Sequence, residues 1–204
     1  RRQRQMCIRD RCVMLSGCTT EQLRNDDTTP NIDSGTPPES AADKPQAQAF
    51  VFKSGVLEIG DFDPYTIGDD IFDPCTEITQ EEFTAAGFED VEPLPEQYAA
   101  LAHGMKSCTG PSDNHIRSPF FLQNNADRDH ISANTGLLEY QSPLIPALYT
   151  YGPRTGDGID CFAQVDTLRG GLVIGVAGIK GFGSQEKNCQ TAITSLEALF
   201  DANQ

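Results

Sequence analysis

The sequence lacks the short motifs that usually identify an enzyme or a metal protein. His103, His115 and His130 are its three histidines, and they form no paired metal spacing. There is no Walker loop and no Gly-x-Gly-x-x-Gly fingerprint. Ser184 follows Gly181-Phe-Gly, but the x-Gly that completes a nucleophile elbow is absent. We therefore expect no catalytic residues, no metal and no cofactor, and we predict that the chain is not an enzyme.

Positive charge is also scarce, with 15 lysines and arginines against 30 aspartates and glutamates and a net charge of −15. Five of the arginines lie in residues 1–18, which carry +4, so the rest of the chain carries −19. Such a surface repels nucleic-acid phosphates and anionic lipid headgroups. We expect no nucleic-acid partner, and either a solubilising surface or attraction for cationic partners or Ca²⁺.

Four aspartates are the candidates for such Ca²⁺ binding, namely Asp61, Asp63, Asp69 and Asp70. Their spacing does not match an EF-hand loop, which needs a central glycine and a distal glutamate. A carboxylate pair of the glycosidase type would meet only in space and would leave no sequence signature. A solvated acidic loop, Ca²⁺ binding and a hydrolase site therefore remain open.

A long hydrophobic run is missing before the one motif that points to a membrane. Leu15-Ser16-Gly17-Cys18 matches the bacterial lipobox, in which the cysteine becomes diacylated and carries palmitate. The apolar run before it is only Cys12–Leu15, whereas a signal peptide needs about 7 to 15 apolar residues. Residues 1–11 look like a translated sequencing adaptor, an artefact that would replace most of the signal peptide. We expect residues 1–18 to be its remnant and Cys18 to be lipidated.

Residues 19–48 are polar, acidic and rich in proline, and they show no periodicity. This composition predicts a disordered linker. About 30 residues of flexible chain have a root-mean-square reach of roughly 30 Å. Together with a diacyl anchor, which attaches stably, such a linker would hold a domain clear of a membrane. Residues 49–204 are then long enough for a single globular domain.

The clearest local signals surround one short helix. Asp73-Pro74 has the composition of a turn, because proline fixes φ and removes a donor. Thr79 and Glu82 form a capping box. Gly87 can adopt the left-handed conformation that ends a helix. Together these residues predict a helix over Gln80–Ala86.

The same stretch carries a family resemblance. Its pattern consists of Asp73-Pro74-Cys75, Ile78-Thr79, Glu81-Glu82 and Ala86-Gly87. This pattern, with the layout of the cysteines, resembles the actinobacterial lipoprotein family called domain of unknown function 3558, over roughly residues 49–204. Members often place a tryptophan two residues after the second cysteine, where this chain has Gly110. The resemblance implies a lipid-anchored, cysteine-paired protein on the outer face of the cell membrane, with an envelope lipid, glycan or protein partner.

The expected domain contains four cysteines, Cys75, Cys108, Cys161 and Cys189. Their gaps of 33, 53 and 28 residues include no Cys-x-x-Cys pair, which fits neither a zinc ribbon nor a thioredoxin-like motif. In an exported protein they would form two disulfides, with four free buried thiols as the alternative. Three pairings are possible. We favour Cys75–Cys108 with Cys161–Cys189, because these join neighbours in the sequence.

Strand patterns dominate the rest of the domain. The strands are expected at Phe50–Phe52, Val56–Ile59, Ile116–Leu122, Leu137–Tyr140, Leu148–Tyr151, Asp160–Val165 and Leu172–Ala177. The last two form a hairpin through Arg169-Gly170-Gly171, and residues 123–135 are expected to be a polar loop. Further helices are expected over Glu96–Met105 and Cys189–Asp201. We predict an α+β fold, with an antiparallel sheet and few helices packed on one face.

Three functions follow from these features. The favoured one is a lipid-anchored extracytoplasmic envelope protein that acts as a non-enzymatic ligand-binding or accessory module. The alternatives are an envelope hydrolase that uses a carboxylate pair, and an adhesive or decoy module without a pocket. A raised carboxylate pKa in a cleft would favour the hydrolase, and an apolar cavity between sheet and helices would favour the binding module.

Overall fold

The computed structural model describes residues 48–97, 105–110, 119–156, 158–178, 181 and 183–203. The predicted signal peptide, Cys18 and the linker up to residue 47 lie outside the described residues. Residues 98–104 are also outside them, and with them most of the helix predicted over Glu96–Met105.

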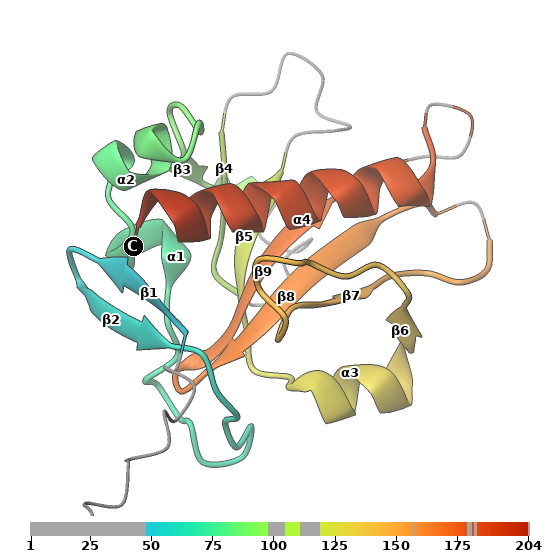
Figure 1. Cartoon of the computed structure of the whole chain (residues 1–204), viewed down its shortest axis with the longest axis horizontal. Helices are drawn as coiled ribbons and strands as arrows, with labels where there is room; N and C mark the ends of the chain where they lie inside the picture. The colour runs from blue at the N-terminus through green and yellow to red at the C-terminus, as the bar shows by residue number, and fades with distance from the viewer. Residues whose placement is uncertain are drawn as a thin grey trace, which may run out of the picture. The chain divides into compact units, whose positions relative to one another are not determined.

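The described chain has a mixed α+β fold built on a seven-stranded antiparallel sheet, in the order β3-β4-β5-β9-β8-β7-β6 (Figure 1). Its strands are β3 (Glu92–Pro93), β4 (Ser107–Thr109), β5 (Phe120–Asn124), β6 (Leu137–Leu138), β7 (Tyr149–Tyr151), β8 (Cys161–Thr167) and β9 (Gly170–Val176). A smaller sheet pairs β1 (Ala49–Phe52) with β2 (Gly55–Glu58). The predicted fold class is confirmed.

The helices are few, and the longest covers one face of the large sheet. They are α1 (Pro74–Glu77), α2 (Gln80–Ala85), α3 (Arg128–Asn134) and α4 (Gln185–Ala202). Figure 1 shows α4 running across the sheet over β8 and β9. The core lies between them, where Leu196 and Leu199 of α4 and Ile174 of β9 are almost completely buried. Burial of these apolar side chains is the main force that holds α4 on the sheet.

The predicted hairpin is confirmed as β8 and β9, which pair from Cys161↔Val176 to Thr167↔Gly170. Its turn is formed by Leu168 and Arg169, so the two glycines predicted for the turn are instead the first residues of β9, where they have different roles. Gly170 has φ +89°, a conformation that side chains disfavour. Gly171 follows it in β9, and a Cβ there would lie 2.4 Å from Nε2 of Gln164. The lack of a side chain at Gly171 therefore leaves room for the side chain of Gln164.

The predicted capping box is confirmed at the start of α2. The backbone N–H of Thr79 donates to Glu82 Oε2 at 2.8 Å, and Thr79 Oγ1 accepts from the Glu82 N–H at 3.3 Å. Gly87 follows the helix with φ +86°, as expected. Glu82 also accepts the backbone N–H of Lys53 at 2.6 Å, which ties α2 to the turn between β1 and β2.

Two local predictions were wrong, and the C-terminal helix is present but begins earlier than predicted. Asp73-Pro74 begins α1, because the Asp73 carboxylate accepts the N–H of Cys75 at 3.0 Å and proline suits the first turn. The polar stretch 123–135 contains the end of β5 and all of α3, whose residues include no buried side chain and so show no apolar periodicity. The last helix begins at Gln185, because Ser184 caps it through the N–H of Lys187.

Candidate functional site

Both favoured disulfide pairs are present. Cys75–Cys108 joins α1 to β4, with Cα atoms 5.5 Å apart. Cys161–Cys189 joins β8 to α4, with Cα atoms 5.0 Å apart, and both cysteines are fully buried. Each bridge therefore fixes a helix to a strand of the large sheet.

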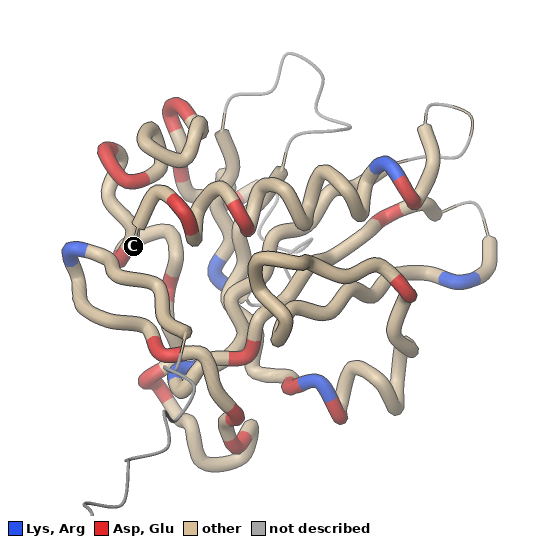
Figure 2. The backbone as a smooth tube through the Cα atoms, viewed as in Figure 1, with Lys and Arg blue, Asp and Glu red and all other residues tan. Residues whose placement is uncertain are grey.

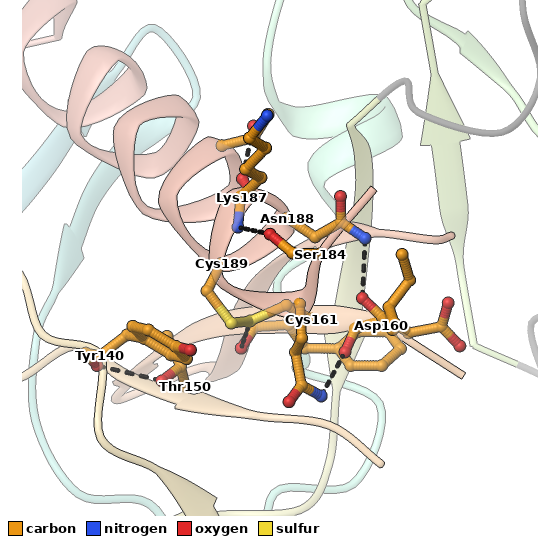
Figure 3. The surroundings of a disulfide bond; sticks show 12 residues. Tyr140, Thr150, Asp160, Cys161, Ser184, Lys187, Asn188 and Cys189 are labelled. Atoms are coloured by element: carbon orange, nitrogen blue, oxygen red, sulfur yellow. Dashed lines mark hydrogen bonds between the residues drawn. A yellow bond between two sulfur atoms is a disulfide. The ribbon is translucent and has the colours of Figure 1, made fainter. Parts of the chain in front are cut away.

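Polar side chains surround the bridge between β8 and α4 (Figure 3). Asn188 donates from Nδ2 to the carbonyl of Ile159 at 2.7 Å, which fixes the first turns of α4 beside β8. Asp160 accepts the N–H of Gly178 at 2.8 Å across the hairpin. Ser184 is used as the helix cap, so its hydroxyl has a structural role.

The second face of β8 carries a buried polar network, because side chains alternate along a strand. At its centre is Gln164, which has no exposed surface. Its Oε1 accepts from Asn124 Nδ2 at 2.8 Å and from the Tyr151 hydroxyl at 3.1 Å. Its Nε2 donates to the Ala126 carbonyl and to Asp166 Oδ1, both at 2.8 Å. The amide is thus fully hydrogen-bonded, as burial requires.

Asp166 is the charged member of this network. Its Oδ1 also accepts the Tyr149 hydroxyl at 2.8 Å, and its Oδ2 accepts the backbone N–H of Arg128 at 3.0 Å. Burial raises the pKa of Asp166 above its usual value, although these hydrogen bonds oppose the shift. Burial likewise raises the pKa of Tyr149 and Tyr151, so both hydroxyls stay protonated and can donate.

A second carboxylate lies on the adjoining turn. Asp127 caps α3 by accepting the N–H of His130 at 2.9 Å, and the same oxygen lies 2.7 Å from His130 Nδ1. Burial alone would raise the pKa of Asp127, but the hydrogen bonds from His130 outweigh it and hold that pKa low. His130 Nε2 is 3.1 Å from the hydroxyl of Tyr65, a residue that is 84 % exposed. The Asp127 carboxylate, the His130 imidazole and the Tyr65 phenol therefore form a short hydrogen-bonded chain near the surface.

The described residues also form a hollow of about 490 Å³ beside α2, which we call the acidic hollow. It is lined by Gln80, Thr84, Glu89, Asp90 and Glu92. Figure 2 shows acidic positions at α1, at α2 and in the segment between β2 and α1, and further ones along α3 and α4. None of the network residues lines this hollow, so the carboxylate with the raised pKa is not part of it.

The four aspartates proposed for Ca²⁺ do not gather into a site. Asp63 accepts the N–H of Tyr65 at 2.9 Å, and Asp70 lies 3.4 Å from Nε of Arg169. In the part of the chain that the structure describes, no three His, Cys, Asp or Glu residues are placed to hold a metal ion. His103 and His115 lie outside that part, whereas His130 is on α3.

The polar network was not predicted from the sequence. Its members are Asn124, Tyr149, Tyr151, Gln164 and Asp166. They come from three strands, and no short motif links them. The only available signal was a pair of polar residues, Gln164 and Asp166, that alternate with apolar ones in a strongly hydrophobic strand.

No protein-family profile, curated protein or solved structure matches this chain. Among the residues described, no helix is both long enough and apolar enough to cross a bilayer.

Proposed function

We propose that this chain is a lipid-anchored, extracytoplasmic envelope protein that acts by binding rather than by catalysis. Cys18 would carry the acyl chains, residues 19–48 would form the tether, and the disulfide-bonded domain would meet its partner on the outer face of the membrane. The resemblance to the lipoprotein family called domain of unknown function 3558 points the same way.

The observation that carries this proposal is the pairing of all four domain cysteines. Disulfides persist in oxidising compartments outside the cytoplasm and are rare within it. Exported bacterial proteins meet such conditions, and a lipobox cysteine is the means by which many of them are retained at the membrane. The two features therefore support each other, although they lie in separate parts of the sequence.

The contacts of the partly buried Asp166 carboxylate weigh against its use as a catalytic acid or base. Asp166 accepts hydrogen bonds from Gln164, Tyr149 and Arg128, which occupy both of its oxygens. A general acid or base must instead reach a proton on the substrate. Asp166 therefore acts as a structural acceptor of hydrogen bonds.

One observation favours the hydrolase as the second candidate. The pKa of Asp166 is raised while that of nearby Asp127 is lowered, and such opposite shifts are typical of acid and base pairs. Asp127→Asn and Asp166→Asn test this directly. If the domain hydrolyses envelope glycans, both variants should lose most activity, and Asp129→Asn should retain it.

Fractionation of cells tests the anchoring. The chain is expressed in an actinobacterial host behind a complete signal peptide, as wild type and as Cys18→Ser. We expect the wild type in the membrane fraction and Cys18→Ser in the soluble extracytoplasmic fraction, with the disulfides intact in both. Equal membrane association of the two proteins would refute a lipid anchor at Cys18.

Native mass spectrometry of the membrane-extracted wild type tests the binding role. We expect a second mass that corresponds to a bound envelope lipid or glycan, absent after the protein is unfolded and refolded. A partner protein recovered by crosslinking would support an accessory role instead. Turnover of a glycan that depends on Asp166 would overturn the binding proposal in favour of the hydrolase.

A further inference from the structure

The helix α3 is held in the fold differently from α4. None of the side chains of α3 is buried, whereas α4 buries eight residues against the sheet and its surroundings. Figure 1 shows α3 at one end of the sheet, beside the short strand β6 and away from the face that α4 covers. Apolar packing supplies most of the stability of helices in proteins. Apolar packing can therefore supply only part of the attachment of α3, through the half-buried Ile131, and polar contacts must supply the rest.

Those polar contacts converge on the first turn of α3 and the residues just before it. The N–H of Arg128 donates to Asp166 Oδ2 at 3.0 Å, and the carbonyl of Ala126 accepts from Gln164 Nε2 at 2.8 Å. The Arg128 guanidinium lies 5.4 Å from the centre of the Tyr149 ring, within reach of a cation–π contact. All three contacts join the segment to β7 and β8.

Both ends of the segment are fixed by other means. Asn124 ends β5, and its Oδ1 accepts the N–H of Ala126 at 3.0 Å. At the far end, Gly136 has φ +80°, and Leu137 then pairs with Tyr151 of β7. A glycine in this conformation can absorb a change of backbone direction with little strain.

We propose that residues 126–135 form a flap that opens as a local unit, hinged at Gly136 and latched to the sheet through Asp166. Opening breaks two hydrogen bonds, from the Arg128 N–H to Asp166 and from Gln164 Nε2 to the Ala126 carbonyl, and leaves β7, β8 and β9 paired. It uncovers the Tyr149 ring and the polar atoms of Gln164 and Asp166 to solvent. Segments that bury little apolar surface are those that open at low free energy.

We call the hydrogen bond between the Arg128 N–H and Asp166 the latch. Several groups surround the latch and set its strength. Tyr149 from β7 and Gln164 from β8 donate to Asp166, while Asp127 of the flap places a second negative charge nearby. The flap also contacts the loop between β2 and α1, because the ring centres of His130 and Tyr65 are 5.6 Å apart. Tyr65 is mostly exposed, so this contact is the weaker one.

Amide hydrogen exchange on the full, oxidised chain tests the flap. The reporters are the N–H groups of Ile131, Thr135 and Gly136, which donate within or just after α3. In the wild type we expect these amides to be less protected than those of α4 and β9. In Asp166→Ala their protection should fall by a further factor of about three to ten, the equivalent of one net hydrogen bond, and α4 should be unchanged.

Two further variants keep this test decisive. Asp129→Ala removes a carboxylate from the same helix without touching β8, and it should leave the protection of the flap nearly as in the wild type. Arg128→Ala removes only the contact with Tyr149, and it should lower flap protection even if Asp166→Ala fails to fold. Equal protection of the flap and of α4 in the wild type and in Arg128→Ala would show that α3 opens only on global unfolding, and would overturn the proposal.

Discussion

Alternate side chains of β8 lie on two chemically different faces of the sheet. Ala163 and Val165 face α4 and belong to the apolar core. Gln164 and Asp166 face the other way and form a hydrogen-bonded network with β5 and β7. This side carries the partly buried carboxylate of Asp166, so the stability of the domain depends on pH.

The pKa of Asp166 gives this dependence a definite sign. Burial raises that pKa above its usual value of 3.8, so protonation of Asp166 favours the folded state. The stabilisation is fully present below the unfolded pKa, and it is lost as pH rises through the folded one. We expect the free energy of unfolding of the wild type, minus that of Asp166→Asn, to decrease between about pH 3 and pH 7. Urea denaturation at each pH measures it, and a difference that is constant or increases with pH would contradict the account.

Gly171 is a second residue, and the polar network restricts which side chains can replace it. A Cβ there would lie 2.4 Å from Gln164 Nε2, whose side chain is held by four hydrogen bonds and cannot move aside. We expect Gly171→Ala to lower the free energy of unfolding by about 1–3 kcal/mol, as overpacking does. Gly60→Ala is the matched control, because it meets only the exposed side chain of Leu168 at 3.1 Å. It should change stability by less than about 0.5 kcal/mol in the same urea titration.

At the scale of elements, the sequence predicted best those segments whose signals are local. The capping box at Thr79 and Glu82 and the hairpin of β8 and β9 were both predicted and are present. The helix α3 was missed because its only strong signal is the cap at Asp127, which resembles many loop aspartates. The polar network could not be predicted, because it depends on which strands become neighbours. No local sequence pattern indicates the strand order β5-β9-β8-β7.

The capping box of α2 makes a prediction at this scale. Thr79→Ala removes one half of the box and leaves the N–H of Glu82 without its acceptor. We expect a loss of about 1 kcal/mol in the free energy of unfolding. Thr84→Ala makes the same chemical change in the same helix, at an exposed position where the hydroxyl donates to the Gln80 carbonyl. It should be neutral or slightly stabilising, and equal losses for the two variants would refute the capping role.

At the scale of the whole molecule, the two disulfides close loops of similar length, with separations of 33 and 28 residues. We expect removal of either bridge by paired alanine substitution to reduce stability by about 2–4 kcal/mol. The loss should be larger for Cys161–Cys189, because both cysteines are fully buried, whereas Cys75 is partly exposed. Denaturation of the two double variants under oxidising conditions measures this order, and a larger loss for Cys75–Cys108 would contradict it.

We propose that the disulfide-bonded domain is attached to a membrane through Cys18. The most direct test is the intact mass of the protein, measured without reducing agent after extraction from the membrane of an actinobacterial host that expresses it behind a complete signal peptide. The account predicts a chain that begins at Cys18, carries a diacylglyceryl group, and is four hydrogens lighter than the fully reduced form, as two disulfides require. An unlipidated chain, or one with four free thiols in its domain, would contradict it.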